Sequence, residues 1–240
     1  MDNQMLPTPL GRQANTFAGK SLQVLKSMIL DGTLQPGQRL NEVELARALG
    51  ISRGPLREAV QRLASDGLVT IISHRGAFVR AFDTEELVEL YELRTALETH
   101  AVRLAARRVD TEDLVDLDEM LRVTEDVLAS AEQHAYPSDL DFHQRVVSLA
   151  GNQTLLRAAV EVNHQIQLAR SRSAQQPQRA RNAFVEHRDI LTALARADGS
   201  GAADLLATHL QHSLTNALQL LRCDPPEDLS GLTTTKEHHS

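Results

Sequence analysis

The sequence has a single cysteine, Cys223, and aromatic residues occupy only 3% of its 240 positions. One cysteine cannot form an internal disulfide, so we expect the chain in the reducing cytoplasm. The scarcity of aromatic residues argues against a single-strand nucleic-acid binder that stacks bases. No run of 18 uncharged apolar residues and no signal-peptide core occur, so we expect neither a membrane span nor secretion. Hydrophobic residues, at 42%, suffice for a packed core.

The net charge of −7 is unevenly distributed along the chain. Residues 1–80 contain ten Lys and Arg against six Asp and Glu, a net of +4. Residues 81–240 contain fifteen against twenty-six, a net of −11. This asymmetry favours a basic module that binds a polyanion, joined to an acidic module with another task. A net charge of +4 over eighty residues is equally compatible with an ordinary protein surface.

The basic part of the sequence predicts three helices. Apolar residues at helical spacing predict the first over residues 16–30, after a loose arm of residues 1–15. Asn41 suits the N-cap of a short second helix, which ends at Gly50. Ser52 suits the N-cap of the third helix.

A basic hairpin is expected after the third helix. Two β-prone runs, at residues 68–72 and 77–79, flank a Ser-His-Arg-Gly turn. The third helix carries Arg53 and Arg57, whose spacing lets both side chains reach phosphates and base edges in a major groove. The order of these elements favours a winged helix-turn-helix that binds double-stranded DNA over a helical bundle whose arginines only solvate one face.

Four segments of this region resemble the DNA-binding domain of the GntR family: residues 34–42, 49–59, 63–69 and 75–79. The resemblance spans about residues 17–80. It implies that the recognition helix, a backbone-contacting arginine and the wing tip touch operator DNA through Arg39, Ser52, Arg53, Gly54, Arg57, Arg75 and Gly76. Gly54 stands where the family commonly has Ser or Thr, so one hydroxyl contact is expected to be missing.

The acidic part predicts an all-α domain over residues 83–223, a six-helix antiparallel bundle followed by a disordered tail over residues 224–240. The winged domain then covers residues 16–82, and the fold class is mostly α. Asp83 and Glu86 can form a capping box at the start of the first bundle helix. The expected helices cover residues 83–108, 110–131, 136–151, 155–172, 179–197 and 202–221.

Three histidines and one aspartate are candidate metal ligands. Asp139 and His143 are four residues apart on one helix face, and His187 and His209 lie on the apolar faces of their helices. A divalent cation would give each buried imidazole a partner, and this ligand set suits zinc, or else nickel, cobalt, manganese or iron. Each histidine alone is also compatible with an ordinary core position, so the spacing leaves both interpretations open.

Residues 93–98, 139–143, 151–152, 186–188 and 208–210 resemble the FCD effector domain, which defines the FadR subfamily of GntR regulators. The resemblance spans about residues 84–222. It implies the metal ligands Asp139, His143, His187 and His209, with a small carboxylate effector at an open metal position. Arg94 matches an arginine of the family's first helix that can fork onto the carboxylate; a structural ion pair is the alternative. Asn163 is a further candidate that could reach the pocket. The other histidines match no ligand position: His100, His134, His164, His212, His238 and His239.

Together these features predict a homodimeric bacterial transcriptional regulator, a repressor and not an enzyme, whose operator affinity changes when a small organic acid binds. Two alternatives remain at this point. One is a regulator that senses the metal ion itself. The other is a metal-dependent hydrolase fused to a DNA-binding module, for which no general-base or nucleophile motif is present.

Overall fold

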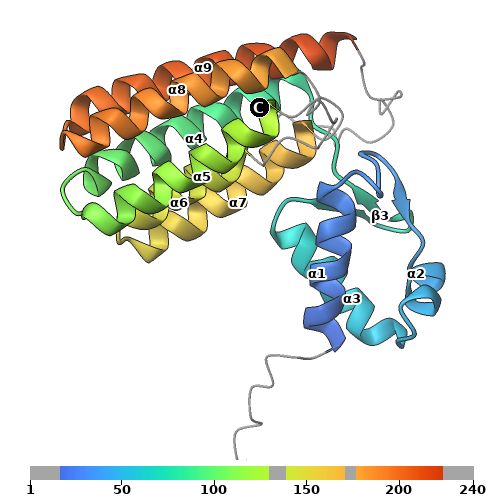
Figure 1. The fold of residues 1–240 in the computed structure, drawn as a ribbon. Helices are drawn as coiled ribbons and strands as arrows, with labels where there is room; N and C mark the ends of the chain where they lie inside the picture. The colour runs from blue at the N-terminus through green and yellow to red at the C-terminus, as the bar shows by residue number, and fades with distance from the viewer. Residues whose placement is uncertain (1–16, 130–138, 171–176, 224–240) are drawn as a thin grey trace, which may run out of the picture.

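The computed structural model describes residues 17–129, 139–170 and 177–223, with side chains described throughout except at 139, 140, 177, 178, 222 and 223. The expected arm, the expected tail and the expected helix start at residues 136–138 lie outside these ranges, as do His134, His238 and His239. Within them the chain is mostly helical with one small sheet, which confirms the predicted fold class. Figure 1 shows a long helical bundle beside a smaller N-terminal part.

The N-terminal part contains the three predicted helices, α1 (Phe17–Leu30), α2 (Glu42–Ala48) and α3 (Arg53–Ser65). The side chain of Asn41 accepts hydrogen bonds from two backbone N–H groups of α2, which confirms its predicted capping role. Ser52 occupies the N-cap position of α3, but its exposed hydroxyl makes no capping hydrogen bond. The start of α3 was therefore predicted correctly, whereas the capping hydrogen bond expected from Ser52 is absent.

The sheet has three antiparallel strands in the order β1-β3-β2, which are Arg39–Leu40, Gly76–Val79 and Val69–Ile72. β2 and β3 form the predicted hairpin. β1 was not predicted, because two residues are too few to show the alternation that marks a strand. Arg39 pairs with Phe78 of β3, so this short strand places Arg39 beside the wing.

The bundle contains six helices within the described residues: α4 (Thr84–Ala105), α5 (Thr111–Ala129), α6 (Asp139–Leu149), α7 (Gln153–Arg170), α8 (Pro177–Ala195) and α9 (Gly199–Cys223). The predicted capping box opens α4, since the side chains of Asp83 and Glu86 each accept a hydrogen bond from the other's backbone N–H. α4 contacts α6, α7 and α9 and runs through the middle of the bundle (Figure 1). Side chains from four helices can therefore meet around α4.

α7 also packs against the winged part. Its Leu168 is fully buried in the same apolar cluster as Leu25, Leu56 and Leu63 of α1 and α3. The Gln165 side chain donates a hydrogen bond to the backbone carbonyl of Asp66. No helix in the described ranges combines the length and the apolarity needed to cross a membrane.

Candidate metal centre and nucleic-acid interface

Three of the predicted metal ligands meet inside the bundle. His143 lies on α6, His187 on α8 and His209 on α9, and their exposed fractions are 1%, 2% and 0%. Each belongs to an apolar helix face that the bundle buries; Ile190 and Leu194, for example, share the inward face of α8 with His187. Phe142 stacks on the His187 ring, with ring centroids 4.4 Å apart. Hydrophobic packing therefore fixes where the three imidazoles point.

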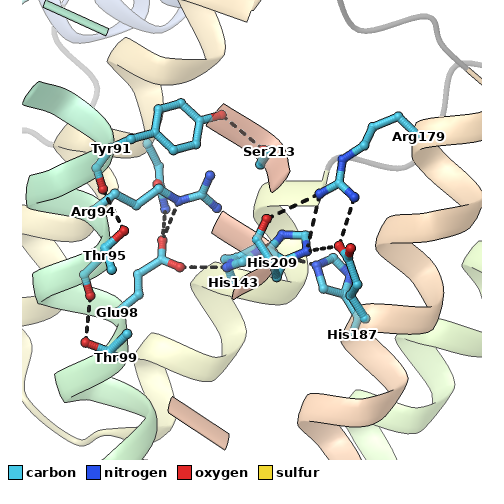
Figure 2. A network of polar contacts seen from close by, with 12 residues as sticks. Tyr91, Arg94, Thr95, Glu98, Thr99, His143, Arg179, His187, His209 and Ser213 are labelled. Atoms are coloured by element: carbon cyan, nitrogen blue, oxygen red, sulfur yellow. Dashed lines mark hydrogen bonds and ion pairs between the residues drawn. The ribbon is translucent and has the colours of Figure 1, made fainter. Parts of the chain in front are cut away.

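The three Nε2 atoms converge on one another (Figure 2). The Nε2 of His143 lies 3.0 Å from that of His209 and 3.2 Å from that of His187. One ligand atom from each histidine lies within 4.8 Å of the other two. A divalent ion with metal–nitrogen bonds of about 2.1 Å places neighbouring imidazole nitrogens roughly 3.0–3.4 Å apart. The spacing of the three nitrogens thus fits a metal ion with three imidazole ligands.

Carboxylates fix the tautomers of two of these histidines. The Nδ1 of His143 lies 2.6 Å from Oε2 of Glu98, and the Nδ1 of His209 lies 2.7 Å from Oε2 of Glu186. An ionised carboxylate only accepts hydrogen bonds, so each Nδ1 carries the hydrogen and each Nε2 presents a lone pair. The Nη2 of Arg179 approaches the Nδ1 of His209 at 3.4 Å, which is a weaker contact than the 2.7 Å one.

Two facing lone pairs 3.0 Å apart repel one another unless a cation or a proton lies between them. A carboxylate that holds the outer nitrogen of a histidine is the arrangement found around metal-bound imidazoles, where it orients the ring and raises its basicity. The donor set, its burial and its tautomers therefore all fit a divalent cation.

Glu98 connects His143 to two further candidate residues. Its Oε1 accepts hydrogen bonds from Nε of Arg94 at 2.9 Å and from Nδ2 of Asn163 at 3.2 Å. Burial acts to raise the pKa of Glu98, but the positive charge of Arg94 and the contact with His143 outweigh it and hold that pKa well below its ordinary value. Glu98 and Arg94 are each 1% exposed, so they form a buried ion pair.

Glu186 plays the matching role on the opposite side of the centre. Burial acts to raise its pKa, but hydrogen bonds from His209, Arg179 and His212 lower it to about 2. Its Oε2 accepts from Arg179 at 2.8 Å, and its Oε1 lies 2.7 Å from Nδ1 of the exposed His212. Arg179 also approaches the backbone carbonyl of His209.

The structure thus brings together His143, His187, His209, Arg94 and Asn163 of the predicted site. Asp139 begins α6 one turn before His143, but its side chain lies outside the described part of the chain. Sequence reasoning assigned no role to Glu98 or Glu186. A signal was available, since Glu98 stands four residues after Arg94 and Glu186 directly precedes His187.

The predicted DNA contacts lie on two exposed elements. Ser52 precedes α3 as its N-cap residue, Arg53, Gly54 and Arg57 lie in its first two turns, and all four residues are exposed. A Cβ atom added to Gly54 would meet nothing within 4 Å, so a DNA backbone can approach closely at this point. The Nε of Arg57 donates to Glu42 of α2 at 3.0 Å, while 66% of the Arg57 side chain stays exposed.

The wing carries the remaining predicted contacts. Arg75 is exposed at the tip of the β2–β3 hairpin. The guanidinium of Arg39 crosses the wing beside Gly76, with its Nε 3.4 Å from the position of an added Cβ. Gly76 has a φ of +105°, and His74, two residues earlier, has a φ of 60°, which gives the tip its tight turn. Arg39 of β1 therefore lies beside the hairpin tip that carries Arg75 and Gly76.

A winged helix-turn-helix joined to a helical bundle that can hold a ligand is the architecture of a bacterial DNA-binding transcriptional regulator. Residues 22–79 match the bacterial regulatory proteins of the gntR family, and residues 89–212 match the FCD domain. The chain belongs to the GntR family and to its FadR-like members, which carry an FCD domain. This confirms the resemblance predicted from the sequence.

Named relatives agree with this assignment. The Nta operon transcriptional regulator of Aminobacter aminovorans is 34% identical over 188 residues, which cover 78% of this chain and 88% of that protein. The HTH-type transcriptional regulator YdhC of Bacillus subtilis is 30% identical over 199 residues, which cover 82% and 89%. Both are transcriptional regulators by name, which supports the prediction that the chain is not an enzyme and leaves the hydrolase alternative without support.

Solved structures share the fold. A transcriptional regulator GntR from Rhodococcus sp. RHA1 aligns with a TM-score of 0.72 at 28% identity, covering 84% of this chain and 97% of that one. McbR/YncC of E. coli aligns with the same TM-score at 24% identity, covering 85% of this chain and 98% of that one.

Proposed function

We propose that this regulator is an operator-binding repressor whose helical domain holds a divalent metal ion and a small carboxylate effector. Effector binding changes the affinity of the winged domain for DNA. One observation carries the proposal: the Nε2 atoms of three buried histidines converge, and carboxylates hold the Nδ1 atoms of two of them. The winged domain covers residues 16–82 and the effector domain residues 83–223.

His143, His187 and His209 would hold the metal ion, with Asp139 as a fourth ligand from the same helix as His143. Three imidazoles and one carboxylate suit zinc first, and nickel, cobalt, manganese or iron are also compatible. When bound, the ion supplies a positive charge and an open coordination position for an anionic ligand. Glu98 and Glu186 orient two of the imidazoles toward it.

Arg94 supports a carboxylate as the effector. Its guanidinium is buried beside Glu98, and Figure 2 shows it extending from Glu98 toward the side of the bundle that contains the histidines. The ion pair with Glu98 uses the Nε of Arg94, and an arginine has four further N–H groups for a bidentate contact with a carboxylate. The structural ion pair and the effector contact are therefore compatible roles for this residue.

The DNA contacts follow from the exposed positions of the predicted residues. The first turns of α3 would enter the major groove, and Arg53 and Arg57 would reach base edges or phosphates. The wing, with Arg39, Arg75 and Gly76, would lie along the neighbouring backbone. Two copies of the chain would form a homodimer that reads the two halves of a palindromic operator in the cytoplasm.

Thermal unfolding tests the metal site. Zinc should raise the melting temperature of the metal-free wild-type protein, because the ion binds only the folded arrangement of the histidines. The variant His187→Ala should lose this response. The control His100→Ala changes an exposed histidine of α4 and should keep it. An equal zinc response in His187→Ala and the wild type would contradict the proposed site.

A second candidate is a regulator in which the metal ion is itself the signal. The three histidines come from α6, α8 and α9, so an ion alone would tie three helices together. Operator binding measured with zinc and with chelator, both without organic acids, separates the two functions. A large zinc effect in the absence of any acid favours the metal sensor. An effect that also requires an acid favours the carboxylate-responsive repressor.

A further inference from the structure

Asn163 has a buried hydrogen-bond acceptor that the contacts around the metal centre do not use. The residue lies on α7 and is 5% exposed. Its Nδ2 donates to Oε1 of Glu98 at 3.2 Å. Among the described residues, nothing donates a hydrogen bond to its Oδ1.

The orientation of this amide is fixed by Glu98. The carboxylate accepts hydrogen bonds from Arg94 and from His143, and it has no hydrogen of its own to donate. Turning the amide over would place the Asn163 oxygen against the Glu98 oxygen, with two acceptors facing each other. Oδ1 therefore points away from Glu98, and it needs a donor that the described residues do not provide.

Arg94 and Asn163 bind the same oxygen atom of Glu98, so a ligand that reaches one of them lies next to the other. A ligand carboxylate at this point can accept from an arginine, but it cannot donate to Oδ1. A ligand hydroxyl can donate. A ligand ammonium can donate as well, but it would lie beside the buried guanidinium of Arg94 and near the cation site, where like charges repel.

The hydroxyl pair formed by Tyr91 and Ser213 provides a donor on the Arg94 side. The two oxygens are 3.1 Å apart, and both side chains are buried. The pair has two hydroxyl hydrogens, and its internal hydrogen bond uses one of them. The tyrosine ring lies 5.8 Å from the Arg94 guanidinium (Figure 2). The second hydrogen is therefore available to an acceptor oxygen of a ligand that binds Arg94.

We propose that the effector is a hydroxy acid, whose carboxylate binds Arg94 and whose hydroxyl donates a hydrogen bond to Oδ1 of Asn163. This inference rests on the proposed carboxylate-effector function and narrows the class of ligand. Asn163 is then the residue that distinguishes a hydroxy acid from its deoxy counterpart, because a ligand without the hydroxyl leaves the buried oxygen without a donor.

Calorimetric titration of the zinc-loaded protein tests this with two matched sets of acids. The three-carbon set is propionate, lactate and alanine, and the four-carbon set is succinate, malate and aspartate. Within each set only one substituent changes, from hydrogen to hydroxyl to ammonium. In the wild type, the hydroxy acid of at least one set should bind about tenfold tighter than both of its counterparts.

The variants Asn163→Leu and Asn163→Ala should bring the hydroxy-to-deoxy ratio of that set close to one; this ratio, and not the affinity for either acid alone, is the readout. Leucine keeps the volume of the side chain, and alanine provides a second test if leucine does not fit. The control Asn216→Leu, an amide of α9 in a separate groove beside Glu186, should keep the wild-type ratio. Zinc titration of each variant verifies that the centre is intact.

Three results would overturn the inference. Equal affinities for hydroxy and deoxy acids in the wild type would mean that the hydroxyl is not recognised. A hydroxyl preference that survives in both Asn163 variants would mean that the metal ion, and not Asn163, recognises it. Tightest binding of the amino acid would assign the contact to an ammonium group. If the zinc-loaded wild type bound none of the six acids, or if zinc did not bind, the proposed effector function itself would fail.

Discussion

Replacing Glu98 with glutamine should disrupt both the bundle and the metal centre. Glu98 accepts from Arg94 and Asn163 on one oxygen and from His143 on the other. A glutamine has one acceptor oxygen and one NH2 group, so it can satisfy only one of these sides. If its NH2 faces Arg94, donors face each other. If its NH2 faces His143, that histidine must move its hydrogen to Nε2, where the hydrogen blocks metal binding.

The size of the effect follows from burial. Glu98 and Arg94 are each 1% exposed, and removing one charge of a buried ion pair costs about 3–5 kcal/mol, because the remaining charge keeps its desolvation penalty. Loss of a carboxylate that orients a metal-binding histidine lowers metal affinity about 10–100-fold. We therefore expect Glu98→Gln to lower the free energy of unfolding by about 3 kcal/mol without metal and to weaken zinc binding at least tenfold.

Urea unfolding with chelator at pH 7, followed by circular dichroism, measures the first effect, and zinc titration measures the second. Glu119→Gln is a matched control, because Glu119 pairs with Arg122 at 2.7 Å on the exposed face of α5. It should leave the urea midpoint unchanged. A midpoint for Glu98→Gln that moves no further than that of the control would refute the argument from burial.

Three other substitutions test the remaining parts of the structure. Arg57→Ala should weaken binding to a duplex selected from a random pool by about 10–100-fold in fluorescence anisotropy, with an unchanged melting temperature because the side chain is 66% exposed. Gly67→Ala should lower stability by about 1–2 kcal/mol in urea unfolding, because φ is +72° at this position. Burial and the charge of Lys26 lower the pKa of His164 to about 4, and Asp66 opposes this with a smaller effect. In the unfolded chain the same imidazole takes up a proton near pH 6.5. Wild-type stability should therefore fall as the pH drops from 6.5 toward 4, and His164→Gln should show a smaller fall; equal slopes would contradict the assignment.

Local sequence patterns predicted most of the fold because each depends on neighbouring residues alone. Asn41 caps α2 and the Asp83–Glu86 box opens α4, since a side chain two or three residues away is sufficient for either contact. Gly50 has the predicted positive φ of +64° at the end of its helix. The inward faces of α6, α8 and α9 were predicted from the same periodicity, and the three histidines on those faces do meet.

Features that depend on distant residues were not predicted. The strand β1 exists because Arg39 and Leu40 pair with β3 almost forty residues later, and no two-residue pattern signals such pairing. Glu98 contacts His143 across 45 residues, and Glu186 contacts His209 across 23. Periodicity assigns a residue to a helix face, but only packing decides which side chain on another helix it meets.

Because helical periodicity does not reveal contacts between distant residues, the sequence suggested two separate modules, whereas in the structure α7 contacts both of them. Asn163 contacts Glu98 inside the bundle, Gln165 binds the backbone of Asp66 in the winged part, and Leu168 belongs to the core of that part. These three residues lie within two turns of one helix. A ligand can change DNA affinity only through contacts that differ between two states of the protein. Because α7 contacts both Glu98 beside the histidine cluster and the winged core, a displacement of this helix would alter both sets of contacts at once.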